Sequence, residues 1–452
     1  MPDPQTLPAN SPRLPVRGWG ESLVILTLCL VSFGWDLRSE PHFVDESAYI
    51  SQSFYADLYA SGRWDHPAWL DYAGYDLPPL PKYLIGLSLW SVGERRPTRA
   101  DTHAWYQNTS RQFVGPAALA VARRPSVLLG AVGCVAIFWL GTLLAGPWAG
   151  RVAALLLAIN PLYRMHARRA MSDVPAECFL LLSLVFGMIV WRRAFRRSPW
   201  PRSWFLVLAA GMMVGLATLS KLNGVLGGLV LLGWIALALI LGQFTHRSKG
   251  FLGAAAAVVA GGVAFGTFVA LNPYLTAHPP APVAPELARE APMTFLDRTW
   301  AVYDHRATIS ALAMKSFPHN ALPTLADRVA AVAVQGFGRF GPLGPRGRTD
   351  STIRFDWQQD WGALVWLPLV GAGSIILGWQ GRRQARAGLP PLVWLALTYL
   401  TVVVAVVTPF IPLAWDRYFL SLQAPSALVV GCLVGAGIDR WLREPSSTEA
   451  RL

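Results

Sequence analysis

The sequence predicts an all-α protein that crosses a membrane many times. Of its 452 residues, 53% are hydrophobic and only 14% are charged, a composition that excludes an ordinary soluble domain. The second observation is a series of long apolar runs. A helix needs about 20 apolar residues to cross a hydrocarbon core about 30 Å thick. In a membrane protein, the positions of the charges that sum to +13 indicate how the chain is oriented in the membrane. We therefore expect no nucleic-acid partner.

About ten apolar runs are expected to span the membrane. They lie near 20–36, 125–146, 148–163, 173–191, 203–220, 223–241, 250–271, 362–379, 390–409 and 418–438. The first could instead be a signal peptide, because Arg13 and Arg17 precede it, but no small-residue cleavage site follows. The four cysteines lie in these runs without CxxC spacing, which excludes a thiolate metal site.

The loops between the runs predict the orientation. "RRAFRRSPWPR", "HRSKG" and "GRRQARAG" follow the fourth, sixth and eighth runs, and short basic loops are typical of the cytoplasmic side. An even number of spans then places both termini inside, in a plasma or inner membrane. The expected parts are a cytoplasmic tail (1–19), a membrane core (20–271) with a first extracytoplasmic loop (37–124), a long extracytoplasmic loop (272–361), C-terminal transmembrane helices (362–438) and a cytoplasmic tail (439–452).

The predicted outer face carries unexpected positive charge. Arg123 and Arg168 lie there in "AVARRPS" and "YRMHARRAMSD", on the same face as the acidic pair Asp45 and Glu46. A single such arginine could reach out to lipid headgroups. The set together favours a phosphate-bearing ligand, which arginine binds through a bidentate fork. Because runs five to ten contain almost no ionisable residue between their ends, we expect the chemistry at this mouth of the bundle.

The first extracytoplasmic loop is expected to form helices that lie on the membrane surface. "DESAYISQSFYADLYASG" is amphipathic, and "GYDLPPLPKYLIGLSLW" turns at Pro78 and Pro79 before a helix restarts. The two prolines would fix Asp76 and Lys82 at either end of a rigid corner. Alternatively, the corner only packs the loop onto the membrane.

Six stretches together resemble a known family. They are the acidic pair after the first run, the Asp-x-x-Pro-Pro-Leu-x-Lys corner, "RRPSVLLGAVGCVAIFWLGTLLAG" with "HARRAMSDVPAECFLLLSLVFG", "GLATLSKLNG" and "DRYFLSLQAPSAL". In this order they resemble protein O-mannosyltransferases and aminoarabinose transferases, which are polyprenyl-phosphate-dependent enzymes of the GT-C fold. The resemblance covers most of 40–225 and 415–427. Two features depart from it: Leu77 stands where a histidine often precedes the double proline, and the family usually has eleven or more spans.

The resemblance implies an inverting glycosyltransferase at the extracytoplasmic face. It would move a sugar from a polyprenyl-phosphate donor to a hydroxyl of an acceptor lipid, glycan or protein, among membrane lipids. Such a transfer needs a base for the hydroxyl proton, and the family's motif implies Asp45, with Glu46 orienting it. Alternatively, the two carboxylates only stabilise the N-terminus of a helix by interacting with its dipole. The alternative is a non-enzymatic function, either as a lipid-linked-sugar flippase or as a polysaccharide export component.

Cations are needed to stabilise the departing phosphate. Our candidates for this role are Lys82, Arg123, Arg168 and Arg417, with Asp76, Asp173 and Lys221 as supporting residues. Asp76 or Asp173 could also supply the second carboxylate of a glycoside hydrolase. Asp173 could hold an arginine in place, or share a divalent cation such as Mg or Mn with Asp45, but no ligand spacing decides this. The long loop at 272–361 could cover the site and select the acceptor.

Overall fold

The structure of the protein is a computed structural model that describes residues 16–107, 114–195, 203–241, 247–278, 294–345 and 355–443. Within these ranges the chain is helical, and strand pairing is limited to one isolated bridge between Ala321 and Leu413. The prediction of an all-α fold is therefore confirmed for the described residues.

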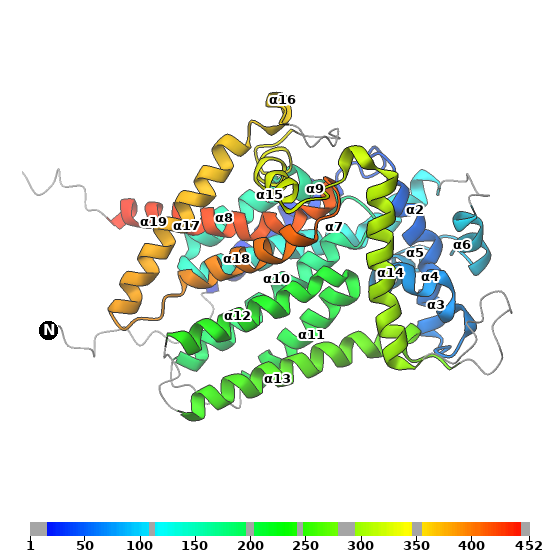
Figure 1. Cartoon of the computed structure of the whole chain (residues 1–452), viewed down its shortest axis with the longest axis horizontal. Coiled ribbons are helices and arrows are strands. Elements are labelled where there is room, and N and C mark those ends of the chain that lie inside the picture. The colour runs from blue at the N-terminus through cyan, green and yellow to red at the C-terminus, as the bar shows by residue number, and fades with distance from the viewer. Residues whose placement is uncertain are drawn as a thin grey trace, which may run out of the picture.

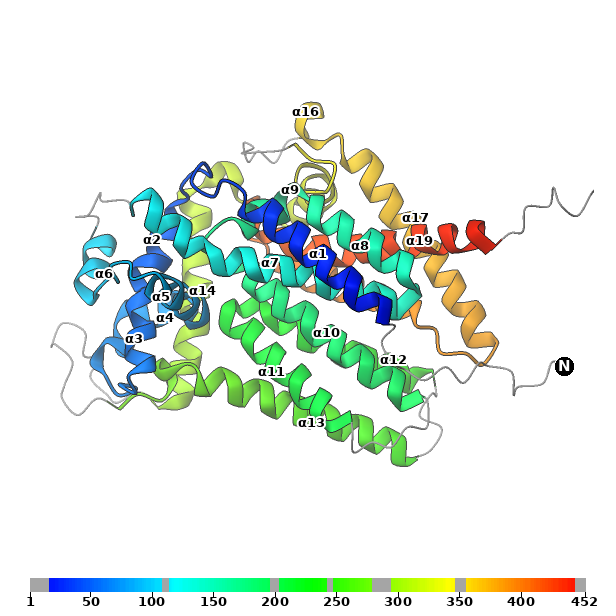
Figure 2. The same ribbon diagram turned by 180° about the vertical axis from the view of Figure 1, so that it is seen from behind.

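Long helices form the body of the molecule and mostly run alongside one another (Figures 1 and 2). They are α1 Val16–Gly34, α7 Pro116–Ala145, α8 Pro147–Ile159, α10 Asp173–Phe195, α11 Trp204–Ser220, α12 Leu226–Ile240, α13 Arg247–Ala270, α17 Ala363–Arg386, α18 Val393–Phe410 and α19 Gln423–Arg443. Seven helices of the described chain are long and apolar enough to cross a membrane. Three shorter apolar helices coincide with the first, third and fifth predicted runs. The total of about ten spans thus stays a prediction.

Small residues let three of these helices approach closely. Between α7 and α8, a Cβ placed on Gly141 would lie 2.8 Å from the Cα of Gly150. On α19, a Cβ on Gly435 would lie 2.4 Å from the backbone nitrogen of Ala149 in α8. The turn between α7 and α8 depends on Gly146, whose φ of +102° is a conformation that other residues rarely adopt. Close packing through glycine is typical of helices in lipid, where no hydrophobic force drives them together.

The short helices gather at one end of the bundle, which we call the α2–α6 end (Figure 1). They are α2 Val44–Ser51, α3 Tyr55–Ala60, α4 Tyr72–Asp76, α5 Pro79–Ser91 and α6 Arg99–Tyr106. The long helix α14 Phe295–Ser316 runs across this end, almost perpendicular to the bundle. The remaining helices are α9 Pro161–Ala167, α15 Leu325–Ala331, a π-helical segment Val332–Arg339 and α16 Trp357–Asp360.

The expected proline corner fixes the short helices in place. α4 ends at Asp76 and α5 begins at Pro79, a position where the missing N–H of proline costs nothing. Behind the corner, the rings of Tyr55 and Trp69 lie with their centroids 4.8 Å apart, and Trp69 also contacts Tyr83 of α5. This aromatic cluster holds α3 and α5 against each other, so the corner has a rigid base.

Candidate functional site

Glu46 forms a buried ion pair with Arg123. Both side chains are fully buried, and two N–H···O bonds of 2.8 and 2.7 Å join them. The Glu46 carboxylate also accepts bonds from the backbone nitrogens of Phe43 (3.0 Å) and Ala170 (2.8 Å). This network joins the first turn of α2 to α7 and to the turn before α10. Glu46 is thus placed to fix α2, rather than to face a substrate.

Arg123 and Arg168 were predicted to bind phosphate. In the structure, each of these arginines binds other groups of the protein. Besides Glu46, the Arg123 guanidinium donates to the backbone carbonyls of Leu37, Glu40 and Pro41. Arg168 donates to Glu40 at 2.8 Å and to three carbonyls at the end of α1, those of Phe33, Trp35 and Asp36. A cation at a helix C-terminus satisfies its last carbonyls. We therefore do not carry the phosphate role of these two arginines forward.

Asp45 lies beside Glu46 but faces the opposite way, toward Arg417. The carboxylate of Asp45 accepts a short bond from the Arg417 guanidinium, which comes from the 3₁₀ turn Asp416–Tyr418 before α19. Both side chains remain accessible, with exposed fractions of 32% and 25%. The Arg417 guanidinium also lies 5.0 Å from the ring centroid of Trp415. The fold thus brings together the predicted base and one predicted phosphate ligand across 372 residues of sequence.

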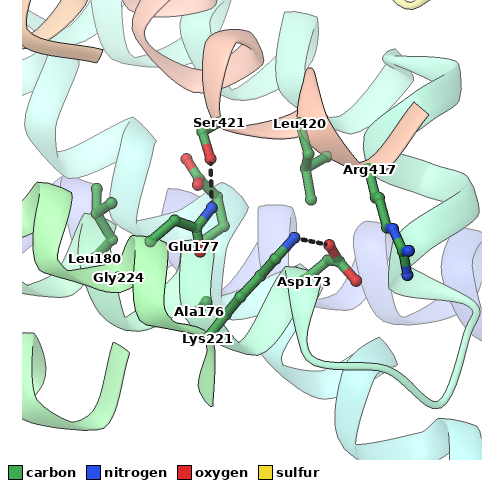
Figure 3. Close-up of a pocket in the computed structure, with 10 residues that line it drawn as sticks. Asp173, Ala176, Glu177, Leu180, Lys221, Gly224, Arg417, Leu420 and Ser421 are labelled. Atoms are coloured by element: carbon green, nitrogen blue, oxygen red, sulfur yellow. Dashed lines mark hydrogen bonds and ion pairs between the residues drawn. The ribbon is translucent and has the colours of Figure 1, made fainter. Parts of the chain in front are cut away.

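Asp173 and Lys221 form a second ion pair next to Arg417. The Lys221 ammonium lies 2.6 Å from the Asp173 carboxylate. These two residues and Arg417 line a pocket with about 240 Å³ of empty space, partly open to solvent. In Figure 3, the ammonium and the guanidinium lie on opposite sides of the Asp173 carboxylate. Asp45, Arg417, Asp173 and Lys221 therefore form a row of alternating charge, and the last three of them line the pocket.

The floor of this pocket is polar. Glu177 lies one helical turn below Asp173 on α10, and its carboxylate accepts a 3.2 Å bond from the hydroxyl of Tyr399. On the other side of the pocket, the amide of Asn223 donates to the Ser421 hydroxyl at 3.1 Å (Figure 3). Polar groups that point into one small cavity are typical of a ligand site.

A buried histidine lies behind the row of charge. The His166 ring is almost fully buried between Asp173 (3.8 Å) and Asp416 (3.7 Å), and neither ring nitrogen makes a hydrogen bond within the described chain. Arg169 approaches Asp416 to 3.6 Å. Burial raises the pKa of Asp416, but His166, Arg169 and the backbone N–H of Arg417 outweigh it and hold the pKa well below its usual range. We did not predict a role for His166 or Asp416, although each is the first residue of a quoted motif, those that contain Arg168 and Arg417.

The proline corner carries a separate cluster around Asp76. Its carboxylate accepts bonds from the hydroxyl of Tyr106 and from His305 of α14 (3.1 Å). Burial raises the pKa of Asp76, but these two bonds and the charge of Arg306 outweigh it, so the pKa is lowered. The sequence did not indicate His305 or Arg306, because 272–361 contains no motif that we could place.

Lys82 is buried beneath this corner. Its ammonium donates to the carbonyl of Ala73 at 2.6 Å and lies 4.9 Å from the ring centroid of Tyr55. Burial lowers its pKa to about 7, although Asp76 acts in the opposite direction. A phosphate ligand is expected to be accessible, whereas the Lys82 side chain, like that of Arg168, is buried.

A divalent cation does not fit these residues well. Within the described ranges, no group of three His, Cys, Asp or Glu is placed to hold a metal ion. The two carboxylates that we considered for Mg or Mn, those of Asp45 and Asp173, each face a cationic side chain instead. We therefore derive no step through a metal.

Comparison with known proteins bears on the fold of the chain. Residues 100–264 match the family model described as dolichyl-phosphate-mannose-protein mannosyltransferase. ArnT from Cupriavidus metallidurans, solved bound to undecaprenyl phosphate, has a similar structure, with a TM-score of 0.51 and 16% identity over 93% of this chain and 60% of that chain. The oligosaccharyltransferase AglB from Archaeoglobus fulgidus, solved with an inhibitory peptide and a dolichol-phosphate, has a TM-score of 0.55 and 14% identity over 96% of this chain and 52% of that chain.

This chain has the GT-C glycosyltransferase fold. The resemblance seen in the motifs is thereby confirmed. The chain spans between about half and three fifths of the length of these two solved structures. A search of curated proteins returns no match. The matched residues 100–264 include Asp173 and Lys221, whereas Asp45 and Arg417 lie outside them.

The row of charge combines a carboxylate that can accept a proton with cations that can bind an anion. Asp45 is an accessible carboxylate that can take a proton. Arg417 and Lys221 are cations that can donate hydrogen bonds to an anionic oxygen, and both line the pocket. Glu46, Arg123 and Arg168, in contrast, are bonded to partners inside the protein, so this row is the candidate functional site.

Proposed function

We propose that the protein is an inverting glycosyltransferase that moves a sugar from a polyprenyl-phosphate donor to an acceptor hydroxyl at the extracytoplasmic face. The observation that carries this proposal is the contact between Asp45 and Arg417 beside Lys221. The lipid phosphates named for ArnT and AglB support a donor of this class, by analogy between folds.

The reaction breaks one bond at the anomeric carbon and forms another. The acceptor oxygen attacks from one face of the sugar, and Asp45 takes the hydroxyl proton as the new C–O bond forms. The bond from the anomeric carbon to the phosphate oxygen breaks, and its electron pair leaves with the polyprenyl phosphate. Arg417 and Lys221 stabilise the negative charge that develops there. Attack from the opposite face inverts the anomeric configuration.

Donor binding would also release the base. Arg417 is paired with Asp45. A phosphate that binds Arg417 replaces this carboxylate, because a guanidinium binds phosphate through the same fork of N–H groups. Asp45 then faces the acceptor hydroxyl with its proton-accepting oxygen free. Glu46 supports this step by holding the first turn of α2 through Arg123.

The proposal is tested with purified protein, a polyprenyl-phosphate sugar and candidate acceptors. Release of polyprenyl phosphate and labelling of the acceptor are measured together. Arg417→Gln should lower turnover by about 100-fold to 1,000-fold, the effect of removing one group that stabilises transition-state charge. Arg383→Gln, which removes a guanidinium that lies 3.5 Å from the Trp379 ring on α17, is the matched control and should leave turnover unchanged.

The rival function predicts a different result. A lipid-linked-sugar flippase would move the intact donor between leaflets of a vesicle without releasing polyprenyl phosphate. If the wild-type protein did this and released no polyprenyl phosphate with any donor or acceptor, the glycosyltransferase proposal would be wrong.

A further inference from the structure

His166 is a buried histidine that the proposed reaction does not use. It lies at the C-terminal end of α9, and its side chain is only 1% exposed. The Nδ1 atom of its ring faces Asp173 at 3.8 Å, and the Nε2 atom faces Asp416 at 3.7 Å. Buried polar groups are usually hydrogen-bonded, and neither ring nitrogen is bonded to a described residue. The position of this ring between two carboxylates therefore needs a functional explanation.

The two facing carboxylates distinguish the charged ring from the neutral one. A neutral imidazole carries one N–H and can donate to only one of the two carboxylates. An imidazolium carries an N–H on both nitrogens and can donate to both. The distances of 3.7 and 3.8 Å are longer than hydrogen bonds, although they allow ion pairs. A small movement of each carboxylate toward the ring would close both contacts, and only the charged ring could donate in both.

Each of these two carboxylates also holds one of the two cations of the row. The other oxygen of Asp173 lies 2.6 Å from the ammonium of Lys221. The Asp416 carboxylate accepts a 2.6 Å bond from the backbone nitrogen of Arg417, which fixes the 3₁₀ turn that carries this guanidinium. His166 is thus linked to Lys221 and to Arg417 through one residue each.

The charged groups around the ring come from several elements. Asp173 begins α10, Asp416 lies in the turn before α19, and Arg169, in the turn after α9, lies 3.6 Å from Asp416. The charged residues of α7 and α8, which also pack against α9, have other surroundings: Arg123 and Arg151 pair with Glu46 and Glu21, and Arg124 is exposed. Within the described chain, the two carboxylates are therefore the charges that directly face the ring.

The charges of the site balance when the ring is neutral. Three carboxylates and three cations pair with one another in and beside the row: Asp45, Asp173, Asp416, Arg417, Lys221 and Arg169. Three negative and three positive charges cancel, so this set offers no excess positive charge to a phosphate. A bound phosphate adds a negative charge in a partly buried site, where charges interact more strongly than in water. One proton on His166 would restore the balance.

We propose that His166 is a positioning residue whose ring takes up a proton from water when the donor phosphate binds. The imidazolium then bridges Asp173 and Asp416, and these two carboxylates hold the two cations of the row against the phosphate. The proton returns to water when the polyprenyl phosphate leaves, so an N–H bond is the only bond that forms and breaks at this ring. The inference rests on the proposed function for the presence of a phosphate beside Arg417 and Lys221.

The proposal couples phosphate binding to pH. A proton that strengthens phosphate binding is itself bound more tightly, by the same factor, when the phosphate is present. Histidine changes its charge between about pH 5 and pH 8. The phosphate affinity of the wild type should therefore fall by about tenfold as the pH rises across this range, an ordinary size for coupled binding. His166→Gln cannot take up the proton, so its affinity should change little with pH and should match that of the wild type at about pH 8.

Calorimetry measures both the affinity and the proton. The full-length protein in detergent is titrated with farnesyl methyl phosphate, a phosphodiester whose single negative charge does not change near neutral pH. Titrations in two buffers of different ionisation enthalpy report how many protons are taken up on binding. The wild type should take up as much as about one proton near neutral pH, and His166→Gln should take up none. A purely structural role of His166 would lower the stability of this variant without removing the proton uptake.

His103→Gln is the matched control. The ring of His103 also faces a carboxylate, that of Asp71 at 3.9 Å, at the same end of the molecule. Asp71 pairs with Arg99, which is not a member of the row. This variant should keep the pH dependence and the proton uptake of the wild type.

Equal proton uptake and equal pH dependence in the wild type and in His166→Gln would overturn the inference. If His166→Gln does not fold, nitrogen-15 labelling of the histidine rings of the wild type decides the question by NMR. The chain has 8 histidines, and the inference is wrong if none of their rings becomes charged when the phosphodiester is added. Neither measurement involves turnover. A failure of sugar transfer would contradict the proposed function alone, whereas a failure here would leave Asp45, Arg417 and Lys221 in their proposed roles.

Discussion

Asp45 and Glu46 are adjacent in sequence, yet their two ion pairs lie in opposite surroundings. The Glu46–Arg123 pair is fully buried and every oxygen of its carboxylate is bonded. The Asp45–Arg417 pair is partly exposed, and Arg417 lines a pocket. The difference indicates that one carboxylate of the motif holds the fold, while its neighbour is left accessible for chemistry.

The energetics of the two pairs support this division. Removing one partner of a buried, fully bonded pair leaves an uncompensated charge and costs about 3–5 kcal/mol. An accessible pair contributes only about 0–1 kcal/mol, because water solvates both groups when they separate. A donor phosphate can therefore replace Asp45 at Arg417 at little cost, whereas no ligand can replace Glu46 at Arg123.

Asp45→Asn should have the largest effect, and it tests whether the accessible carboxylate of the pair is the catalytic one. If Asp45 is the base, turnover should fall by about 100-fold to 10,000-fold, the range for a positioned acid–base group. Donor binding should survive, because the cations hold the phosphate. Turnover and binding of undecaprenyl phosphate are measured on the same preparation.

A matched carboxylate serves as the control. Asp57→Asn removes a partly exposed carboxylate of α3 that pairs with Arg96 on the same end of the molecule. It should leave turnover within about twofold. An Asp45→Asn protein that transfers sugar as fast as this control would show that the base lies elsewhere, with Asp76 as the next candidate.

Glu46→Gln tests the other half of the comparison. The change leaves Arg123 buried without a counter-charge, so unfolding free energy should fall by about 3–5 kcal/mol. The expected signs are a lower melting temperature and poor yield in detergent. Replacing both partners, as in Glu46→Gln with Arg123→Met, should recover part of the loss. A stable Glu46→Gln protein without activity would instead identify Glu46 as the catalytic carboxylate.

Much of the fold and part of the candidate site could be predicted from the sequence. Apolar runs predict the helical membrane fold because their length follows from the thickness of the bilayer. The motifs also led us to Asp45, Arg417, Asp173 and Lys221, which the structure brings together. Chain order and charge were sufficient here because these residues lie at the ends of helices, where loops converge.

The sequence could not show which arginines face inward. Arg123 and Arg168 carry the same charge as Arg417, and only the fold shows that backbone carbonyls at the end of α1 surround them. Arg306 was missed for a related reason. It lies on α14, which crosses the bundle only in three dimensions, and no local pattern places it beside Thr218 of α11.

Lys82 offers the smallest and most specific test of the fixed region. Unlike Arg123, its buried ammonium has no carboxylate at hydrogen-bond distance among the described residues. Its pKa is lowered to about 7 from the ordinary 10.5 because burial disfavours the charged form. The unfolded chain keeps this proton up to about pH 10.5, so unfolding takes up a proton between pH 7 and pH 10.5. The contribution of Lys82 to stability should therefore rise with pH across this window and be most unfavourable below pH 7.

Lys82→Met keeps the volume but does not titrate. The melting temperature of the wild type, relative to Lys82→Met, should thus be higher at pH 9 than at pH 7 by about 2 °C. Parallel melting temperatures across this range would mean that Lys82 keeps its charge when folded, and Lys82 would then return as a candidate ligand for the donor phosphate.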